Sequence, residues 1–448
     1  MSQMRFPKGF LLGTSTAAYQ IEGASREDGR GPSIWDVFSH VPGNITNGHT
    51  GDVACDHYHR YKQDVGLMKE LGVNGYRMSI SWSRVLPEGK GRINSKGLDF
   101  YNRLVDTLAE NGITPMVTLY HWDLPQALQE LGGWGNRDTA DYFAEYADII
   151  YRTLGDRVKY WNTLNEPWVT AYAGHYHGRH APGATDFGLA VQVSHHLMLA
   201  HAKAVEVYRG CDHKDGKMGI ALNLYPIYPA SNDPMDIETV HRVDGYHNRW
   251  FLDPVLKGSY PEDMLTLYQK HYQVPELAPD DMKTIASQKV DFLGVNYYMR
   301  KVVRYLEASD LLHYEEVLPK ESKYTDMNWE IYPQGMYDLF MRIQKDYDNP
   351  HMIITENGCA FKDTVRQNGV ILDDDRQSFL EQHLDTALKA ISDGIRLDGY
   401  FIWSLLDNFE WAHGYGKRFG LFYTDYTTQE RLYKKSALWL KEYIQNHL

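Results

Sequence analysis

Short apolar and β-branched runs recur along the whole chain, separated by stretches with helical periodicity. Eight runs are candidate strands, at residues 10–14, 75–81, 114–120, 160–166, 217–223, 291–298, 352–358 and 399–405. Between several of them, apolar residues recur every three or four positions. Two examples are Tyr61, Val65, Met68 and Leu71 before Gly72, and Leu98, Tyr101, Val105 and Leu108 before Gly112. These stretches predict helices that end near the glycines.

The alternation of strand and helix predicts a parallel sheet with crossover helices. Eight such units that close on themselves form a (β/α)₈ TIM barrel, in which catalytic groups lie at the carboxyl ends of the strands. A doubly wound open sheet shows the same alternation, but it more often has a glycine-rich phosphate turn, and the chain has no such motif. Since no linker or low-complexity tract divides the sequence, we expect one catalytic domain over residues 1–448.

Composition narrows the choice of partner and compartment. The chain has 46 Lys and Arg against 59 Asp and Glu, a net charge of −13, which argues against a nucleic-acid partner. No apolar run is long enough to span a membrane, and three dispersed cysteines suit a reducing compartment, so we expect a cytoplasmic protein with no membrane partner. The excess of acidic residues does not indicate the oligomeric state, and a homo-oligomer is one of the states it allows.

Two glutamates stand at the ends of two candidate strands. Glu166 lies in the segment TLNEP and Glu356 in ITENG. Either one alone could be a helix N-terminal or salt-bridge residue. Polar and aromatic residues at other strand ends favour a shared site: Gln20, His121, Trp122, Asn165, Asn223, Asn296, Tyr298 and the run 403–411. Cleavage of a glycosidic bond needs two carboxyl groups in different protonation states, and this pair can provide them.

The chain resembles the β-glucosidases of glycoside hydrolase family 1, from FLLGTSTAAYQIEGA near its start to GLFYTDYTTQERLYKKSALW near its end. TLNEP and ITENG match the two catalytic motifs of that family. The resemblance implies a retaining (β/α)₈ hydrolase that needs no cofactor or metal. It also implies that Glu166 is the general acid/base and Glu356 the nucleophile.

The resemblance further implies roles for the residues around this pair. Arg77 and Tyr298 would hold the nucleophile, and His180 and Trp329 would lie on the leaving-group side. The whole substrate-binding set would be Gln20, His121, Trp122, Asn165, Asn223, Asn296, Tyr298, Trp403, Glu410, Trp411 and Phe419. Among these, Trp411 would donate from its indole N–H, and Phe419 would also lie towards the leaving group.

The chemistry of a retaining pair sets two expectations for the carboxyl groups. Their separation should be roughly 5–5.5 Å, the spacing at which one can attack the anomeric carbon directly. Proximity to an ionised Glu356 should raise the pKa of Glu166, so that it starts protonated.

Glu410 bears on the choice of substrate. Family members that hydrolyse 6-phosphosugars have Ser at this position, with a Lys and a Tyr nearby, whereas this chain has Glu410, Lys417 and Phe419. A carboxylate about 4 Å from a phosphate charge would cost roughly 4 kcal/mol at an effective dielectric near 20. We therefore expect cello-oligosaccharides and aryl β-glucosides as substrates, with a 6-phospho-β-glucosidase as the alternative within the family.

Two readings from other classes stay open. A non-catalytic sugar-binding barrel would use the same aromatic and polar groups, although it would not need two carboxyl groups. A metal-dependent hydrolase would use histidines such as His57 and His59 or His175 and His177, but no zinc-site spacing accompanies them.

Overall fold

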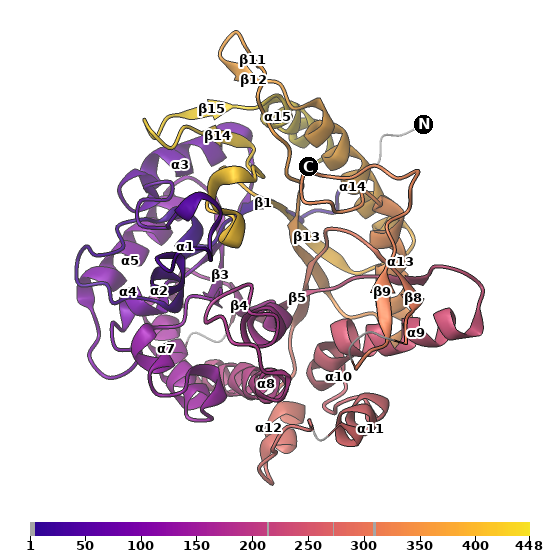
Figure 1. Ribbon diagram of the computed structural model, residues 1–448. Helices are drawn as coiled ribbons and strands as arrows, with labels where there is room; N and C mark the ends of the chain where they lie inside the picture. The colour runs from indigo at the N-terminus through magenta and orange to yellow at the C-terminus, as the bar shows by residue number, and fades with distance from the viewer. Residues whose placement is uncertain (1–4, 213–214, 272, 308–310) are drawn as a thin grey trace.

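The computed structural model describes residues 5–212, 215–271, 273–307 and 311–448, and eight of its strands close into a parallel barrel (Figure 1). The barrel strands in spatial order are β1 (Leu11–Ser15), β2 (Gly75–Ser79), β3 (Thr114–Tyr120), β4 (Tyr160–Asn165), β5 (Lys217–Asn223), β7 (Phe292–Asn296), β10 (Met352–Asn357) and β13 (Leu397–Trp403). β13 pairs with β1 and closes the barrel. The predicted fold and all eight predicted strands are confirmed.

Helices surround the strands as crossover connections. The long ones are α3 (His57–Leu71), α5 (Ser95–Glu110), α7 (Thr139–Leu154), α8 (Phe187–Gly210), α13 (Pro333–Asp346), α14 (Asp374–Ser392) and α15 (Lys435–His447). The two helices predicted from periodicity are α3 and α5. Gly72 ends α3 with a φ of 81°, a left-handed conformation that glycine adopts without a steric penalty.

Shorter elements occupy the connections. The short helices are α1 (Ala18–Ile21), α2 (Ile34–Ser39), α4 (Trp82–Val85), α6 (Gln126–Gln129), α9 (Pro234–Asp244), α10 (Trp250–Leu256), α11 (Glu262–Lys270) and α12 (Asp281–Ser287). The 3₁₀ segments are η1 (Thr46–Gly48), η2 (Gly133–Gly135) and η5 (Trp411–Gly416), and the π-helical ones are η3 (Val169–Ala173) and η4 (Gly245–Arg249). The extra strands are β6 (Ile227–Pro229), β8 (Lys301–Tyr305), β9 (Tyr314–Glu316), β11 (Arg366–Gln367), β12 (Val370–Ile371), β14 (Phe422–Thr424) and β15 (Arg431–Tyr433).

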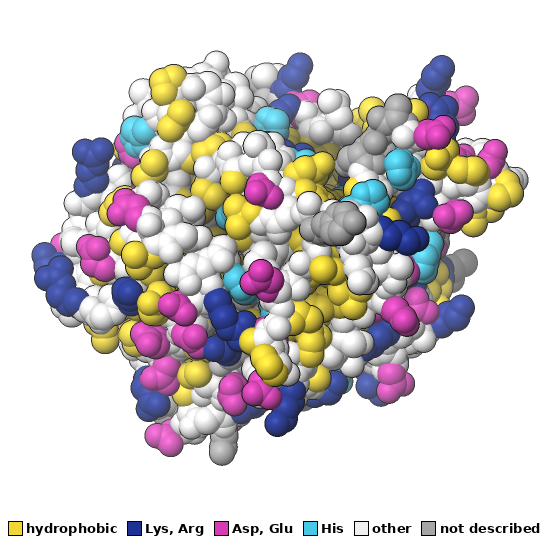
Figure 2. All heavy atoms as spheres, turned by 60° about the horizontal axis from the view of Figure 1, so that its bottom comes forward, with side chains coloured by type: hydrophobic (Ala, Val, Ile, Leu, Met, Phe, Trp, Pro, Cys, Tyr) yellow, Lys and Arg dark blue, Asp and Glu magenta, His cyan; other side chains and the backbone are white. Residues whose placement is uncertain are grey.

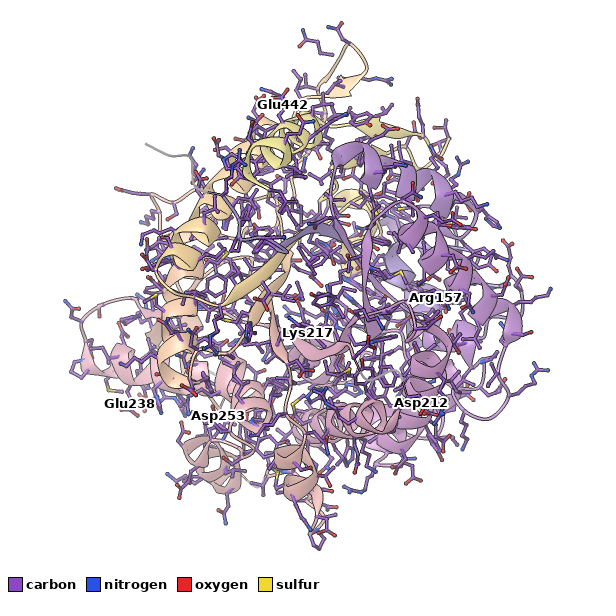
Figure 3. The ribbon with its side chains drawn as sticks, turned by 180° about the vertical axis from the view of Figure 1, so that it is seen from behind. Arg157, Asp212, Lys217, Glu238, Asp253 and Glu442 are labelled. Atoms are coloured by element: carbon purple, nitrogen blue, oxygen red, sulfur yellow. The ribbon has the colours of Figure 1, made fainter. Side chains whose placement is uncertain are left out.

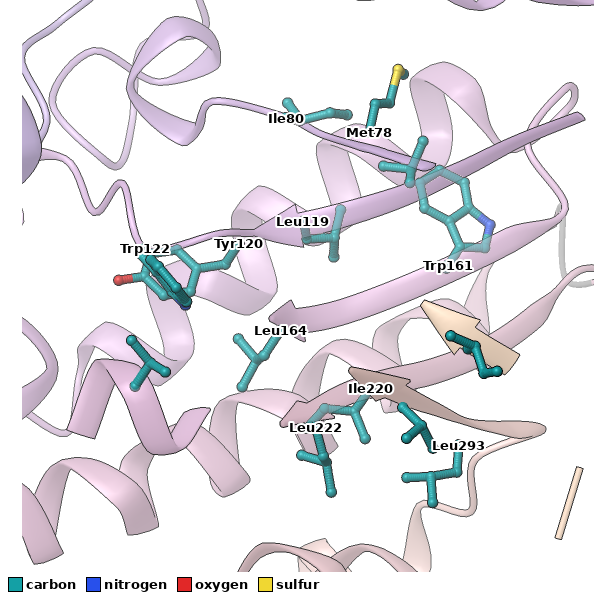
Figure 4. Packing of buried hydrophobic residues seen from close by; sticks show 14 of the residues in the cluster. Met78, Ile80, Leu119, Tyr120, Trp122, Trp161, Leu164, Ile220, Leu222 and Leu293 are labelled. Atoms are coloured by element: carbon teal, nitrogen blue, oxygen red, sulfur yellow. The ribbon is translucent and has the colours of Figure 1, made fainter. Parts of the chain in front are cut away.

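Apolar side chains fill the barrel and the layer between strands and helices. One buried cluster comprises Leu11, Met116, Phe292, Ile353 and Phe401, each from a barrel strand. A second, larger cluster joins strands to helices, and Figure 4 shows part of it along β3, β4 and β5. The Trp161 ring of β4, for example, lies 5.0 Å from Tyr151 of α7. The carboxyl ends of the strands, by contrast, carry the polar residues.

The end of the barrel at which the strands begin lies opposite the end that carries the polar residues. Figure 3, seen from behind, shows Lys217 at the first residue of β5, with Arg157 and Asp212 in the loops before β4 and β5, so this is the end where strands begin. On the face seen in Figure 2, acidic and basic side chains are interspersed. Among the described residues, no helix combines the length and apolar character needed to cross a membrane.

A buried ionic network ties together the loops after β10 and β13. Asp407 accepts hydrogen bonds from Arg418 Nη1 at 2.7 Å and Lys434 Nζ at 2.6 Å. Lys434 also donates to Asp363 at 2.5 Å, and Arg376 donates to Asp363 at 2.8 Å. Because every charge in the network has an opposite partner, burial does not leave a lone charge. The network fixes the segments that flank Glu410 and Phe419.

A substitution at Gly358 tests how closely the chain after β10 approaches β13. A Cβ atom at this position would lie 1.7 Å from the backbone oxygen of Trp403, which cannot move away as a side chain can. We expect Gly358→Ala to lower the free energy of unfolding by about 3 kcal/mol or more. Gly210→Ala is the matched control, since a Cβ there meets nothing within 4 Å and should change stability by less than about 1 kcal/mol. Thermal unfolding followed by circular dichroism measures both, and equal midpoints for the two variants would contradict the packing described.

Candidate active site

Glu166 and Glu356 come together at the carboxyl end of the barrel. Glu166 directly follows the last residue of β4, and Glu356 is the penultimate residue of β10. Asn296, the last residue of β7, lies opposite Glu356 in the strand register and donates from Nδ2 to Glu166 Oε1 at 2.6 Å. Both carboxyl groups are buried, with exposed fractions of 7% for Glu166 and 4% for Glu356. The separation of roughly 5–5.5 Å stays a prediction.

Both oxygens of Glu356 accept a short hydrogen bond. Arg77 Nη1 donates to Oε1 at 2.6 Å, and the Tyr298 hydroxyl donates to Oε2 at 2.7 Å. The Arg77 contact is an ion pair with both side chains almost fully buried. A protonated carboxyl would have to present a hydrogen towards one of these donors, so the arrangement suits the carboxylate. Arg77 and Tyr298 thus both contact Glu356; their role in holding a nucleophile stays a prediction.

Glu166 has the opposite surroundings. Burial, and to a lesser extent the charge of Glu356, raise the pKa of Glu166 to about 8, although the Asn296 amide and Arg77 act against this rise. The sequence analysis predicted that the pKa of Glu166 is raised, but it gave the charge of Glu356 as the cause. In the structure, burial is the larger cause. At neutral pH Glu166 therefore holds a proton, which a general acid needs.

An amide network holds the two carboxyl groups in place. Asn165 Oδ1 accepts from Arg77 Nη2 at 2.6 Å and from Asn296 Nδ2 at 3.0 Å. Thr355 Oγ1 donates to Asn296 Oδ1 at 2.6 Å and so fixes which way that amide points. Since these residues come from β2, β4, β7 and β10, each carboxyl is positioned by several strands and not by one loop.

Three residues of the site have left-handed backbone conformations: Trp122 at φ 78°, Glu166 at φ 45° and Trp411 at φ 46°. Such conformations cost free energy in residues other than glycine and persist where the surroundings over-determine them. Here hydrogen bonds supply part of that support: the Trp122 indole donates to Asn165 O at 2.9 Å, and Glu166 N donates to Ala221 O at 2.8 Å.

The predicted sugar-binding residues lie around this pair. The His121 ring stacks at 5.8 Å on Trp403 and 5.9 Å on Trp411, and its Nε2 lies 3.0 Å from Asn165 Nδ2. Gln20 Nε2 donates to Phe409 O at 2.8 Å, which links α1 to the loop that carries Glu410. Asn223, at the end of β5, is buried and pairs in register with Asn296.

Several buried polar atoms of this set make no hydrogen bond to the described part of the chain. They are Gln20 Oε1, His121 Nδ1, Asn223 Nδ2 and Glu410 Oε2. Buried polar groups in folded proteins nearly always have partners, so four such atoms in one set of residues call for an explanation. Sugar hydroxyls, which both donate and accept, would satisfy all four.

Glu410 differs from the expectation in one respect. The sequence argument treated it as a carboxylate, but burial, followed by the charge of Glu356, raises its pKa to about 8. The neutral acid therefore dominates at pH 7. A neutral carboxyl can donate to one sugar hydroxyl and accept from another, so the residue still suits a polyhydroxylated ligand, while the charge argument against phosphate is weaker than predicted.

The residues predicted for the leaving-group side lie in two places. His180 packs against the aromatic rings of Trp122 and Trp35, each at 5.3 Å. Trp329 lies 5.0 Å from the Tyr298 ring on the other side of the site, and the buried Phe419 ring lies 5.9 Å from Trp329. Phe419 thus packs behind Tyr298, and of this pair only Trp329 is half-exposed.

Sequence reasoning did not single out Trp168, Tyr225 or Thr355, and it included Asn408 only within the run 403–411. Trp168 follows Glu166 by two residues, and the charge of Glu166 is among the causes that raise the pKa of Tyr225. Asn408 Oδ1 accepts from Gln20 Nε2 at 3.0 Å. Thr355 and Trp168 sit inside or next to the two glutamate motifs, which is a signal that the sequence did contain.

Comparison with known proteins identifies the family of this barrel. The family described as Glycosyl hydrolase family 1 matches residues 2–448. The chain belongs to glycosyl hydrolase family 1. It is 53% identical to β-glucosidase A of Acetivibrio thermocellus, with all of both chains covered, and 49% identical to the 1,4-β-D-glucan glucohydrolase of Thermotoga neapolitana, with 99% of each covered.

Among solved family-1 structures, the β-glucosidase from Thermotoga maritima in complex with deoxynojirimycin superimposes with a TM-score of 0.96. Its sequence is 50% identical, and the match covers 100% of both chains. The family-1 assignment therefore holds at the level of the fold as well as of the sequence.

The raised pKa of Glu166 predicts the high-pH limb of activity. A group whose pKa is raised to about 8 keeps its proton through neutral pH and loses it as pH rises through that value. We expect kcat/KM for an unactivated aryl β-glucoside to fall about tenfold per pH unit above this pKa.

On the same unactivated substrate, Glu166→Gln should be much slower than the wild type, and its residual kcat/KM should lack this limb because the variant has no proton to lose at this pKa. Glu410→Gln is the control, because Glu410 has a similarly raised pKa and should leave the limb in place when removed. If the high-pH limb survives in Glu166→Gln and disappears in Glu410→Gln, the limb reports the titration of Glu410, which would contradict the role of Glu166 as the acid.

Proposed function

We propose that this family-1 β-glucosidase releases terminal non-reducing β-D-glucosyl residues by a double displacement, with Glu356 as nucleophile and Glu166 as acid/base. One observation carries the proposal: two buried carboxyl groups, linked by a hydrogen-bond chain through Arg77, Asn165 and Asn296, have opposite surroundings. Both oxygens of Glu356 accept from Arg77 or Tyr298, whereas burial raises the pKa of Glu166 to about 8. A non-catalytic sugar-binding barrel has no use for this difference.

In the first step, a Glu356 oxygen attacks the anomeric carbon while the glycosidic bond breaks. The proton of Glu166 goes to the departing oxygen, and a glycosyl ester on Glu356 forms. Arg77 and Tyr298 hold the attacking carboxylate in one orientation. This orientation lowers the barrier because the attacking group does not have to be positioned at the moment of reaction.

In the second step, water attacks the same carbon and the ester bond breaks, so that the electron pair returns to Glu356. Once the ester has formed, the negative charge beside Glu166 is gone, which lowers its pKa and lets it accept the proton of the water. Two inversions at one carbon give net retention. The enzyme ends in its starting protonation state.

We also infer the substrates, the domain organisation and the cellular location of the enzyme. We infer cello-oligosaccharides and aryl β-glucosides as substrates, because orphaned polar atoms and the stacked rings of His121, Trp403 and Trp411 suit an unmodified pyranose. We also infer one catalytic domain over residues 1–448, supported by barrel closure between β1 and β13. A cytoplasmic location is supported by three buried cysteines that form no disulfide.

Removal of the nucleophile tests the assigned roles. Glu356→Ala should lower turnover of an aryl β-glucoside by at least about four orders of magnitude, since no covalent intermediate can form. Azide should restore activity and give the α-glucosyl azide, because azide then attacks from the vacated side. The matched variant Glu166→Ala should instead give the β-glucosyl azide with an activated substrate, because azide attacks the ester from the acid/base side. NMR of the products decides, and the same anomer from both variants would refute the assignment.

The alternative within the family is a 6-phospho-β-glucosidase, and a direct substrate comparison tests it. The buried carboxyl of Glu410 offers a phosphate at most one donor, so we expect kcat/KM for p-nitrophenyl β-glucoside to exceed that for its 6-phosphate by at least about a hundredfold. The release of nitrophenol measures both rates under the same conditions. Preference for the phosphorylated substrate would contradict the proposed substrate class.

A further inference from the structure

Two π-helical segments, η3 and η4, meet beside the acid/base. η3 begins directly after Trp168, and Val169 N donates to Glu166 O at 2.8 Å, so the segment starts at the catalytic loop. η4 interrupts the helical run between α9 and α10 and carries His247. The His247 ring stacks on Trp168 with ring centres 4.7 Å apart and an interplanar angle of 29°. π-Helical turns often occur at functional sites.

His247 is costly as a packing residue. Its exposed fraction is 3%, and neither ring nitrogen has a hydrogen-bond partner among the described residues. Burial, with smaller effects of the cations Lys301 and Arg179 and of His177, lowers its pKa well below the ordinary value, so the ring is neutral. A buried polar ring without partners lowers stability relative to an apolar ring of similar size. What the ring does offer here is its flat face.

The same segment also fixes the loop after β5. Asn248 Oδ1 accepts from Tyr225 N at 3.1 Å, and Asn248 Nδ2 donates to Tyr225 O at 2.7 Å. The Tyr225 ring meets the His247 ring edge to face at 5.6 Å. Two ion pairs hold η4 in place: Asp244, directly before η4, accepts from Arg249 Nε at 3.0 Å and from Arg342 Nη2 at 2.7 Å. His247 is therefore held from behind, while its face supports Trp168.

Trp168 and Tyr225 both lie close to Glu166. The acid/base must come within hydrogen-bond reach of the departing oxygen, so we infer that side chains close to Glu166 border the leaving group. Trp168 follows Glu166 by two residues and has an exposed fraction of only 5%. The charge of Glu166 is also one of the causes that raise the pKa of Tyr225.

We propose that His247 is a positioning residue for sugar leaving groups, which holds the Trp168 indole in the orientation that binds the second glucose unit of a cello-oligosaccharide. This inference rests on the proposed function. The imidazole acts through its face, so any flat ring of similar size at position 247 should serve. A substrate whose leaving group has no surface to bind should not depend on His247.

The test compares two substrates on the same variants: cellobiose, which has a sugar leaving group, and β-glucosyl fluoride, whose leaving group is a single ion. For His247→Ala we expect kcat/KM for cellobiose to fall about fivefold to tenfold, mainly through KM, relative to kcat/KM for the fluoride. His247→Phe, which keeps a flat ring, should stay within about threefold of the wild-type ratio.

His383→Ala is the matched control. His383 is also buried and stacked on an aromatic ring, at 3.9 Å from Phe379, but it lies on α14. Its loss should lower the unfolding temperature without changing the ratio of the two substrates. If His247→Ala does not fold, His247→Leu, which has similar bulk but no flat face, gives the same comparison.

The outcomes separate the inference from the proposed function. A ratio that His247→Ala leaves unchanged, or that His247→Phe lowers as much as His247→Ala does, overturns the role of the ring face. The proposed function would fail separately if the wild-type enzyme hydrolysed neither substrate. Selective loss on cellobiose in His247→Ala, with recovery in His247→Phe, supports the inference.

Discussion

The ion pair between Arg77 and Glu356 is the interaction on which the active site depends. The guanidinium group reaches from β2 to Glu356 on β10 through Nη1 and to Asn165 on β4 through Nη2, both at 2.6 Å. Each side chain is at least 95% buried, so neither charge can be left without the other. Loss of one partner of a buried pair is usually far more costly than loss of an exposed one. The pair thus contributes both to the stability of the barrel and to the orientation of the Glu356 carboxylate.

Burial sets the protonation states of several side chains in the site. Burial is the largest cause of the raised pKa values of both Glu166 and Glu410, and it also lowers the pKa of His121 far below its ordinary value. As a result, the Glu356 carboxylate has the Arg77 guanidinium as its ion-pair partner, while Glu166, Glu410 and His121 are neutral at pH 7. Polar groups fixed in a dry site stabilise developing charge without having to reorganise during the reaction.

Much of this arrangement was predictable from the sequence. The eight strands were visible as β-branched runs because parallel barrel strands are buried on both faces, and the helix ends were visible at glycines such as Gly72. The errors at strand ends have a physical reason: the predicted run at 160–166 included Glu166, but β4 ends at Asn165 because Glu166 turns into a left-handed conformation. Local sequence patterns do not record such a turn.

Side-chain environment was harder to predict than position. Sequence reasoning placed Glu410 and Phe419 in the site, but not the burial that makes the first neutral or packs the second behind Tyr298. It also missed the contact between Trp168 and His247, because residues 79 positions apart become neighbours only when η3 and η4 pack together. Such contacts depend on the tertiary fold, and no motif carries them.

The central claim is that Glu356 becomes covalently attached to the sugar. Incubation with 2-deoxy-2-fluoro-β-glucosyl fluoride should trap the ester, because its fluorine at C2 slows both steps while its good leaving group keeps the first step fast. Mass spectrometry of a proteolytic digest measures where the label lies. The account predicts one fluoroglucosyl group per chain, attached to Glu356; a label on Glu166 or another residue, or rapid loss of activity with no label, would contradict it.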